Sequence, residues 1–384
     1  MNLNRRPSYW EKDALLKPAQ FGVIGSGLVG LGAALEWKRL RPRDRVVVFE
    51  RAAIPAGAST RNAGFACFGS PSELLDDLQT QPESEVWDLV AKRWEGLRYL
   101  RQLIGDAHME YEGLGGYEIF RNGEEALFEA CRDKLESFNA RIESITGEKN
   151  AFEVRDDLIA PFGLHGVRHI ILNRLEGQLH PGKMIGRMQQ LAQAADIQIM
   201  SGMELLSLAE ESETVQLLGT DGYAISCEKV LVATNGFARQ LIGDLSLVAA
   251  RNQVLITYPI PNLALRGAFH YDRGYYYFRN VGDRILFGGG RNLFPTQEET
   301  SNFGLTDNII MPLKELLSEL ILPGREWKID QYWSGILGLG PQKNPIFRFH
   351  GERIFLAVRL GGMGVALGAK LGAKAARQLL ESAT

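Results

Sequence analysis

The sequence has few cysteines, and no pattern pairs them. Its 384 residues include only Cys67, Cys131 and Cys227, without a C-x-x-C motif. An odd and scattered set argues against a disulfide framework and against a structural zinc site. The cysteines therefore predict no metal site.

Positive charge is not in excess either. Lys and Arg together number 43 and Asp and Glu 46, so the formal net charge is −3. Proteins that bind nucleic acid usually carry a basic surface that neutralises phosphates. The composition therefore predicts no nucleic-acid partner.

Long hydrophobic runs are missing as well. No uninterrupted apolar stretch reaches the roughly 18 residues that a membrane-spanning helix needs, so we expect no membrane span. Arg5 and Arg6 precede an apolar run at 21–35 and could imitate an export signal. Charged residues at 11–13 interrupt that approach and no small-residue cleavage site follows the run, so we expect a cytoplasmic protein.

Common catalytic patterns are absent too. The sequence contains no P-loop, H-E-x-x-H or G-x-S-x-G, which are typical of nucleotide hydrolases, zinc proteases and serine hydrolases. His165 and His169 are spaced i,i+4, as in a helical metal pair. The β-branched residues within 164–172 favour a strand instead, so we expect no metal there.

Glycine, in contrast, is abundant and clustered. The chain has 42 glycines among its 384 residues, or about 11%, above the usual level of about 7%. One cluster completes G-x-G-x-x-G over 25–30, directly after a short apolar strand at 20–24. A helical pattern follows over 28–40, and a second strand at 45–49 ends at Glu50. This arrangement is the dinucleotide-binding βαβ unit in its full context.

Each position of this unit has a physical role. Gly25 permits the tight turn, Gly27 lets the backbone approach a pyrophosphate, and Gly30 lets helix and strand pack closely. Glu50 lies 20 residues beyond Gly30, where a carboxylate accepts hydrogen bonds from ribose hydroxyls. A carboxylate at that position also disfavours NADP, because it would repel the 2′-phosphate.

Two further segments fit the same long ligand. The loop at 51–65 is rich in small and polar residues and offers many hydrogen-bond donors. A second glycine turn at 360–368 follows an apolar strand at 354–358 and opens a helix. Helix N-termini attract anions. Two such turns at opposite ends of the chain predict one ligand held from both sides.

In this order the motifs resemble the FAD-dependent D-amino-acid oxidase superfamily, together with glycine, sarcosine and γ-glutamylputrescine oxidases. The resemblance covers most of the chain. It rests on the glycine loop with Glu50 and Arg51, and on the segments 57–64, 179–181, 204–205, 232–237, 251–253, 275–290 and 361–364.

The resemblance implies an α/β fold with two interleaved domains. An FAD-binding Rossmann-like domain of the glutathione-reductase type would comprise residues 1–85, 165–248 and 335–384. An α+β substrate domain would comprise 86–164 and 249–334. Within the latter, 85–104 and 124–138 have the pattern of amphipathic helices, and 118–120 that of a strand.

The resemblance also implies which residues hold FAD. Leu205 would offer its backbone to the adenine, and the helix N-terminus at 362–364 would stabilise negative charge on the flavin. The expected cofactor-binding residues are Gly25, Ser26, Gly27, Leu28, Val29, Gly30, Glu50, Arg51, Ser59, Thr60, Arg61, Asn62, Ala63, Gly64, Phe65, Glu204, Leu205, Thr234, Asn235, Gly236, Gly335, Leu360, Gly361, Gly362, Met363, Gly364 and Val365. Relatives with covalent flavin use a cysteine in the C-terminal part. No cysteine follows Cys227, so we expect FAD to be bound non-covalently.

The function implied is that of an FAD-dependent oxidoreductase resembling amine and amino-acid oxidases. It would oxidise the C–N bond of a small amine or N-substituted amino acid by hydride transfer to flavin, with oxygen as acceptor. Two alternatives stay open. One is a dehydrogenase of the same fold, acting on amino or hydroxy acids, that passes electrons to a quinone or carrier. The other is a non-catalytic flavoprotein subunit.

Substrate-pocket candidates come from an aromatic strand. Strand alternation places Tyr275, Tyr277 and Arg279 on one face of it. Arg279 could receive a carboxylate, or could serve as a structural ion-pair partner. Amino-acid-oxidising relatives often carry an arginine after a Trp-x-Gly segment. In this chain the segment begins at Trp333, and no arginine occurs between it and Pro341. Arg359, directly before the C-terminal glycine turn, is therefore the candidate for a substitute anion clamp, against a scaffold role.

Overall fold

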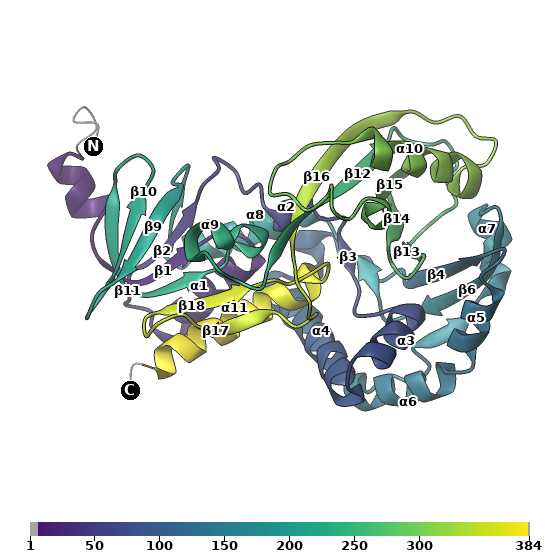
Figure 1. Ribbon diagram of the computed structural model, residues 1–384, viewed down its shortest axis with the longest axis horizontal. Coiled ribbons are helices and arrows are strands. Elements are labelled where there is room, and N and C mark those ends of the chain that lie inside the picture. The colour runs from purple at the N-terminus through teal and green to yellow at the C-terminus, as the bar shows by residue number, and fades with distance from the viewer. Residues whose placement is uncertain (1–6, 383–384) are drawn as a thin grey trace.

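The computed structural model describes residues 7–382. Its elements form two units, each built around one sheet (Figure 1). The first unit contains both ends of the described chain, and the second is made from central segments. Arg5 and Arg6, considered above as part of an export signal, lie outside the described residues.

The first sheet is mostly parallel. Its main path runs β17-β18-β11-β1-β2-β8, and β9 and β10 extend it as an antiparallel meander from β11. Parallel pairing joins β1 to β2 and β11, β2 to β8, and β11 to β18. The strands are β1 (Ala19–Ile24), β2 (Val46–Glu50), β8 (Gln198–Ser201), β9 (Leu205–Glu210), β10 (Val215–Gly219), β11 (Ala224–Val232), β17 (Ile346–Phe349) and β18 (Ile354–Val358).

Helices from three parts of the chain cover one face of this sheet. Helix α1 (Leu28–Leu40) packs along α11 (Gly364–Glu381), and α4 (Glu83–Ile104) packs against α11 in turn. Their contact is close because small residues face one another: a Cβ on Gly372 would lie 2.0 Å from the Val29 carbonyl oxygen. Residues of all three helices and of the sheet share one buried apolar core. Helix α8 (Pro181–Ala194) also packs on α1.

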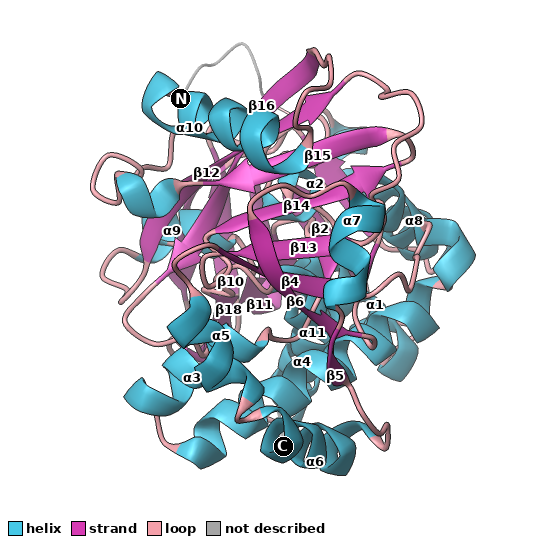
Figure 2. Cartoon of the chain, turned by 90° about the vertical axis from the view of Figure 1, so that its right-hand side faces the viewer, coloured by secondary structure: helices cyan, strands magenta, loops and turns pink. Residues whose placement is uncertain are grey.

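The second sheet is mixed and has the order β16-β12-β15-β14-β13-β4-β6-β5. Helix α10 (Asp307–Leu316) and the short α7 (Ile159–Phe162) lie over one face of it (Figure 2). Phe269, Phe278 and Phe287 of the sheet pack in the core beneath α10. The strands are β4 (Gly116–Arg121), β5 (Phe152–Val154), β6 (Val167–Asn173), β12 (Val248–Thr257), β13 (Ala268–Tyr271), β14 (Tyr276–Val281), β15 (Arg284–Gly289) and β16 (Ile329–Leu339).

Small elements connect the two units. Strands β3 (Phe65–Ala66) and β7 (Gly177–Gln178) form a two-stranded antiparallel sheet. The remaining helices are α2 (Ala58–Arg61), α3 (Pro71–Thr80), α5 (Glu125–Arg132), α6 (Leu135–Thr146) and α9 (Arg239–Ile242).

The mixed α/β fold with an FAD-type parallel sheet is as expected, but one local expectation was wrong. The single helix expected over 124–138 is two helices, α5 and α6. Between them, the Lys134 N–H donates to the Cys131 carbonyl, which tightens the chain into a turn. Strand β11 pairs with β10 at one end and with β1 at the other, and so joins the antiparallel meander to the parallel strands.

Strand pairing also bears on the expected domain boundaries. Strand β6 pairs with β4 and β5 in the second sheet, although the boundary at 165 assigns it to the FAD-binding domain. Strand β16 pairs with β12 as far as Leu339, beyond the boundary at 335. Helix α4, assigned to the substrate domain, packs on α11. The division into two interleaved domains otherwise stays a prediction.

Within the described residues, no helix is both long and apolar enough to cross a membrane. His169 lies on β6 rather than on a helix, and its Nδ1 is 2.8 Å from the Asp156 carboxylate. The i,i+4 spacing of His165 and His169 therefore makes no helical metal pair.

Candidate functional site

A cavity of about 450 Å³, here the first cavity, opens at the carboxyl ends of β1 and β2. Its wall includes the N-terminal turns of α1 and α11. Neither helix is capped by the side chain of its own N-cap residue, and in α1 only the Leu28 N–H meets a side chain of the described residues, the Ser59 hydroxyl at 3.0 Å. Both ends can therefore direct backbone N–H groups and the positive end of a helix dipole toward an anionic ligand.

The turn between β1 and α1 requires glycine at two positions. Gly25 has φ of +107°, a conformation that side chains with a Cβ rarely adopt. A Cβ on Gly30 would lie 1.9 Å from the Gly25 carbonyl oxygen, so only glycine lets the helix approach the turn this closely. These contacts agree with the roles that the motif predicts.

Glu50 ends β2 at the edge of the first cavity and is nearly buried. One carboxylate oxygen accepts from the Ser26 hydroxyl at 2.7 Å and from the Ser26 N–H at 3.3 Å. The other accepts from the Ala52 N–H at 3.1 Å. The glycine turn and the loop after β2 thus fix the carboxylate, which is the arrangement needed to hold ribose hydroxyls.

Most of the expected cofactor-binding residues line the first cavity. They are Gly25, Ser26, Gly27, Leu28, Val29, Glu50, Arg51, Ser59, Asn62, Glu204, Leu205, Thr234, Asn235, Leu360, Gly361, Gly362, Gly364 and Val365. Two aromatic residues that were not among the expected ones, Phe49 and Phe237, also line this cavity. The Arg51 guanidinium lies over the Phe237 ring, 3.8 Å from its centroid.

The other expected cofactor residues lie beyond the first cavity. Arg61, Ala63, Phe65, Gly335 and Met363 line a second cavity instead. Gly30, Thr60, Gly64 and Gly236 line neither cavity. Their contacts are with the backbone: the Thr60 hydroxyl donates to the Pro55 carbonyl, and a Cβ on Gly236 would lie 2.5 Å from the Leu337 carbonyl oxygen.

The second cavity, of about 460 Å³, lies between the glycine turn before α11 and the inner face of the second sheet. It shares several residues with the first cavity: Ala58, Asn62, Leu337, Leu360, Gly361, Gly362 and Val365. A long ligand in the first cavity can therefore present its end to a small molecule in the second.

Tyr275 and Tyr277 both line the second cavity. Tyr277 packs against Phe65 with ring centroids 5.6 Å apart, while Tyr276 and Phe278 face the core under α10. Burial raises the pKa of Tyr277, and a hydrogen bond to Asn252 only partly opposes this effect. Tyr277 therefore presents a neutral hydroxyl and an aromatic face to the cavity.

Arg279 does not line the second cavity. Its buried guanidinium donates to the carbonyls of Ala63 and Leu179, and to that of Asn280. Burial lowers its pKa to about 10. These contacts do not support the expected role in receiving a substrate carboxylate. Arg279 instead fixes the backbone of 62–65 where it passes between the cavities.

Arg359 lines the second cavity, but its charge is already engaged. Its guanidinium donates to the carbonyls of Ser246 and Asn344, and burial lowers its pKa. The residue has φ of +65°, a strained conformation that these bonds help to hold. The Asn235 side chain accepts from the N–H groups of Arg359 and Leu360. This geometry favours the scaffold role over the anion clamp.

Another arginine on the cavity wall was not anticipated from the sequence. Arg291 follows β15 and lines the second cavity. Within the described part of the chain, its guanidinium makes no hydrogen bond or ion pair. A charged residue after the run Gly288–Gly290 was the available signal, but only the fold shows that this strand end faces the cavity.

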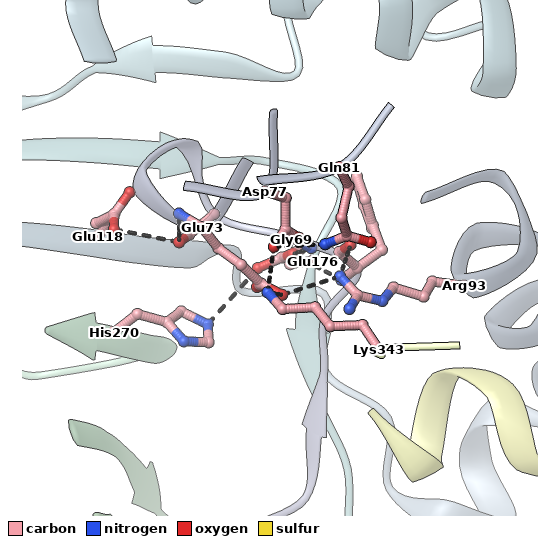
Figure 3. A network of polar contacts seen from close by, with 11 residues as sticks. Gly69, Glu73, Asp77, Gln81, Arg93, Glu118, Glu176, His270 and Lys343 are labelled. Carbon is pink, nitrogen blue, oxygen red and sulfur yellow. Dashed lines mark hydrogen bonds and ion pairs between the residues drawn. The ribbon is translucent and has the colours of Figure 1, made fainter. Parts of the chain in front are cut away.

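One wall of the second cavity carries a network of ionised side chains (Figure 3). Glu73 lies 3.2 Å from Arg93 and 3.4 Å from Lys343. Lys343 also pairs with Asp77 at 2.5 Å. Burial acts to raise the pKa of Glu73, but Arg93, Lys343 and His270 lower it to about 2. The network therefore holds Glu73 ionised and neutralises most of its charge.

Behind this wall lie two carboxyls without a Lys or Arg partner among the described residues, Glu118 and Glu176 (Figure 3). Burial raises the pKa of each to about 7. Glu118 accepts from the Ser70 hydroxyl and from the Ser72 N–H, which fixes the start of α3.

Glu176 accepts from the N–H groups of Phe68 and Gly69. His270 faces Glu176, and burial lowers its pKa to about 4, so its imidazole is neutral near pH 7.

A family comparison matches residues 20–378 to a model described as FAD dependent oxidoreductase. Among curated relatives, the bifunctional protein ThiO/ThiG of Synechocystis is 23% identical over 341 residues. That alignment covers 85% of this chain but only 46% of the relative, so the chain spans about half of its length.

Solved structures share the fold at low identity. Glycine oxidase from Geobacillus kaustophilus superposes with a TM-score of 0.74 at 20% identity, covering 95% of both chains. L-proline dehydrogenase from P. horikoshii gives a TM-score of 0.75 at 16% identity, covering 96% of this chain and 94% of the other.

Proposed function

The chain belongs to the FAD-dependent oxidoreductase family, whose model matches nearly its full length, and we propose that it oxidises the C–N bond of a small amine or amino acid. One observation carries the proposal. The dinucleotide cavity and a second, side-chain-rich cavity meet at Leu360–Gly362. A flavin at that junction and a substrate in the second cavity would be in direct contact.

FAD fits the residues of the first cavity. Glu50 would accept from the ribose hydroxyls, and the N-terminal turns of α1 and α11 would receive its anionic groups. We propose that FAD is held without a covalent bond. Of the three cysteines, Cys131 and Cys227 line neither cavity, and no cysteine follows Cys227 in the sequence. Acid precipitation should then release all of the flavin into the supernatant. Flavin that stays with the precipitate would show a covalent link, for example to Cys67.

Bound FAD would supply the acceptor for the hydride that leaves the substrate carbon. The chain itself orients the substrate and keeps water out. Phe65 and Tyr277 supply an aromatic wall against which an aliphatic amine can pack. The positive end of α11 stabilises negative charge that develops at the junction of the cavities.

The charges on the second cavity favour a substrate with a carboxylate. Glu73 is neutralised by Arg93 and Lys343, whereas Arg291 has no partner among the described residues. An unpaired guanidinium can bind a carboxylate through two parallel hydrogen bonds. We therefore assign substrate carboxylate recognition to Arg291. The names of the two similar structures, glycine oxidase and L-proline dehydrogenase, agree with an amino-acid substrate.

The electron acceptor separates the remaining alternatives. One similar structure is named an oxidase and the other a dehydrogenase, so the shared fold is compatible with oxygen, a quinone or a carrier. We propose oxygen. A flavoprotein subunit without turnover is the second candidate.

The test is flavin reduction without oxygen, followed by exposure to air. Purified holoprotein would be mixed anaerobically with a panel of glycine, N-methylated amino acids, proline, uncharged amines and hydroxy acids, while flavin absorbance is recorded. We expect an amine bearing a carboxylate to bleach the flavin, and air to restore it with formation of peroxide. Bleaching without rapid reoxidation would indicate the dehydrogenase. If dithionite reduces the flavin but no compound of the panel does, C–N oxidation of this substrate class is wrong.

A further inference from the structure

Three metal-ligating side chains converge beside the second cavity. The donor atoms of Cys67, Glu176 and His270 all lie within 4.8 Å of one another. They come from three separate segments. Cys67 follows β3 and Glu176 precedes β7, and the pairing of Ala66 with Gly177 places the two next to each other. His270 comes from β13 of the second sheet.

The Glu176 carboxylate of this cluster is held in place by backbone hydrogen bonds. One oxygen of Glu176 is held by the N–H groups of Phe68, at 2.8 Å, and Gly69, at 3.1 Å. The other oxygen is 3.9 Å from His270 Nε2 (Figure 3). Outer hydrogen bonds that orient a carboxylate ligand are a regular feature of metal sites.

His270 Nε2 supplies a second, independent observation. The atom is buried and makes no hydrogen bond within the described structure. A buried polar atom without a partner costs free energy unless something unseen satisfies it. A cation between Nε2, the Glu176 oxygen and the Cys67 sulfur would satisfy it.

A bound cation would also balance the charge of its own ligands. Cys67 and Glu176 are buried, and Glu176 has no Lys or Arg partner among the described residues. A thiolate and a carboxylate together would carry two negative charges, which a divalent cation would neutralise. We propose that Cys67, Glu176 and His270 form a binding site for a divalent transition metal of the Zn²⁺ class.

The donor set determines the class of metal. One sulfur, one imidazole nitrogen and one carboxylate oxygen suit Zn²⁺ or Co²⁺ and do not suit Mg²⁺ or Ca²⁺, which prefer oxygen ligands. Three protein ligands leave a fourth position free, as in zinc sites that bind small molecules. Cys67 and His270 line the second cavity, so that position faces the cavity. The sequence argument against zinc applied to sites with several cysteines, whereas this site would use one cysteine together with a histidine and a glutamate.

The test uses tag-free holoprotein, treated with a chelator and then desalted. Flavin absorbance would verify that FAD is retained. Titration with Co²⁺ should produce absorption bands at longer wavelength than those of the flavin, saturating at about one equivalent per chain. Zn²⁺ should displace Co²⁺ and abolish these bands, whereas Mg²⁺ should not. A wild-type chain that gives no such bands overturns the proposal.

Matched variants locate the site. Cys67→Ser and His270→Gln should each weaken Zn²⁺ binding by more than about 100-fold, because even outer-shell partners are worth about 10–100-fold. Glu176→Gln keeps an acceptor for the Phe68 and Gly69 N–H groups, so it should fold normally and still lose affinity. Cys131→Ser and His169→Gln change a cysteine and a histidine outside the cluster and should bind as the wild type does. Undiminished binding in all three cluster variants, or lost binding in either control, overturns the assignment.

Discussion

The two cavities differ in whether backbone groups or side chains would contact the ligand. In the first, the groups that would meet an anionic ligand belong to the backbone of a glycine turn and of two helix N-termini, beside one fixed carboxylate, Glu50. The wall of the second is largely side chains, with aromatic rings and charged groups brought together from several elements. The first can hold one kind of ligand whatever the chain acts on. The second can change its specificity by exchanging a few side chains.

The largest expected effect is the loss of FAD from the first cavity. Glu50→Arg would remove the acceptor for ribose hydroxyls and the bonds to Ser26 and Ala52. Losing a charged hydrogen bond costs about 1.5–3 kcal/mol of binding free energy, and reversing the charge increases that cost. FAD should therefore bind at least about 100-fold more weakly. Fluorescence titration of the apoprotein with FAD measures this.

The control is Glu50→Gln, which keeps an acceptor for Ser26 and should retain measurable FAD. Circular dichroism should show that both variants keep the fold. Equal FAD affinity in wild type and Glu50→Arg would remove Glu50 from the ribose site.

The next effect distinguishes a structural role of Arg359 from a role in binding the substrate. Arg359→Leu would leave the Ser246 and Asn344 carbonyls without their donor, at a turn with φ of +65°. We expect the free energy of unfolding to fall by roughly 2–4 kcal/mol, as measured by urea denaturation. The ratio of KM between acidic and uncharged amines should stay as in the wild type. A selective rise in KM for acidic amines would restore Arg359 as the anion clamp.

Arg291→Gln should have the opposite profile. Its guanidinium has no partner among the described residues, so stability should change little. The KM for a carboxylate-bearing amine should rise about 10–100-fold, from the loss of about 1.5–3 kcal/mol of charged hydrogen bonding, while that for an uncharged amine should not. Arg98→Gln, on the exposed side of α4, is the matched control. An unchanged KM for every acidic amine would contradict our assignment.

The smallest effect concerns pH and the buried wall of the second cavity. Burial raises the pKa of Glu118 from 4.5 to about 7. Between these values the folded chain keeps a proton that the unfolded chain releases, so the free energy of unfolding falls as pH rises from 4.5 to about 7. Glu118→Gln keeps an acceptor for Ser70 and Ser72 but cannot ionise. It should reduce this fall by on the order of 1–2 kcal/mol, measured by urea denaturation at several pH values. A slope equal to that of the wild type would show that Glu118 ionises normally.

The same difference explains what the sequence could predict. Gly25, Gly30 and Glu50 have roles set by neighbours within one βαβ unit, so their spacing alone indicated the turn and the carboxylate. Strands such as 20–24 and 354–358 were predictable for the same local reason. Arg291 and Glu73 reach one cavity only because β15 and α3 are brought together by the whole fold.

Partners within the fold also decide what a side chain is free to do. Strand alternation correctly placed Tyr277 and Arg279 on one face, but could not show that the carbonyls of Ala63 and Leu179 would bind the guanidinium. The cysteines give a second example. Their count argued against zinc, whereas the pairing of β3 with β7 places Cys67 beside Glu176.

The order of the strands in the first sheet has a consequence for synthesis. The first strand of the described residues, β1, pairs with β11, and β11 pairs with β18, while α1 packs along α11, the last helix of the described residues. The nascent chain therefore carries an incomplete sheet until β18 and α11 have left the ribosome. We expect a chain truncated before Ile354 to bind no FAD, although it contains the entire glycine loop. Insertion of the cofactor would then have to wait for the synthesis of β18 and α11, long after the glycine loop has been made.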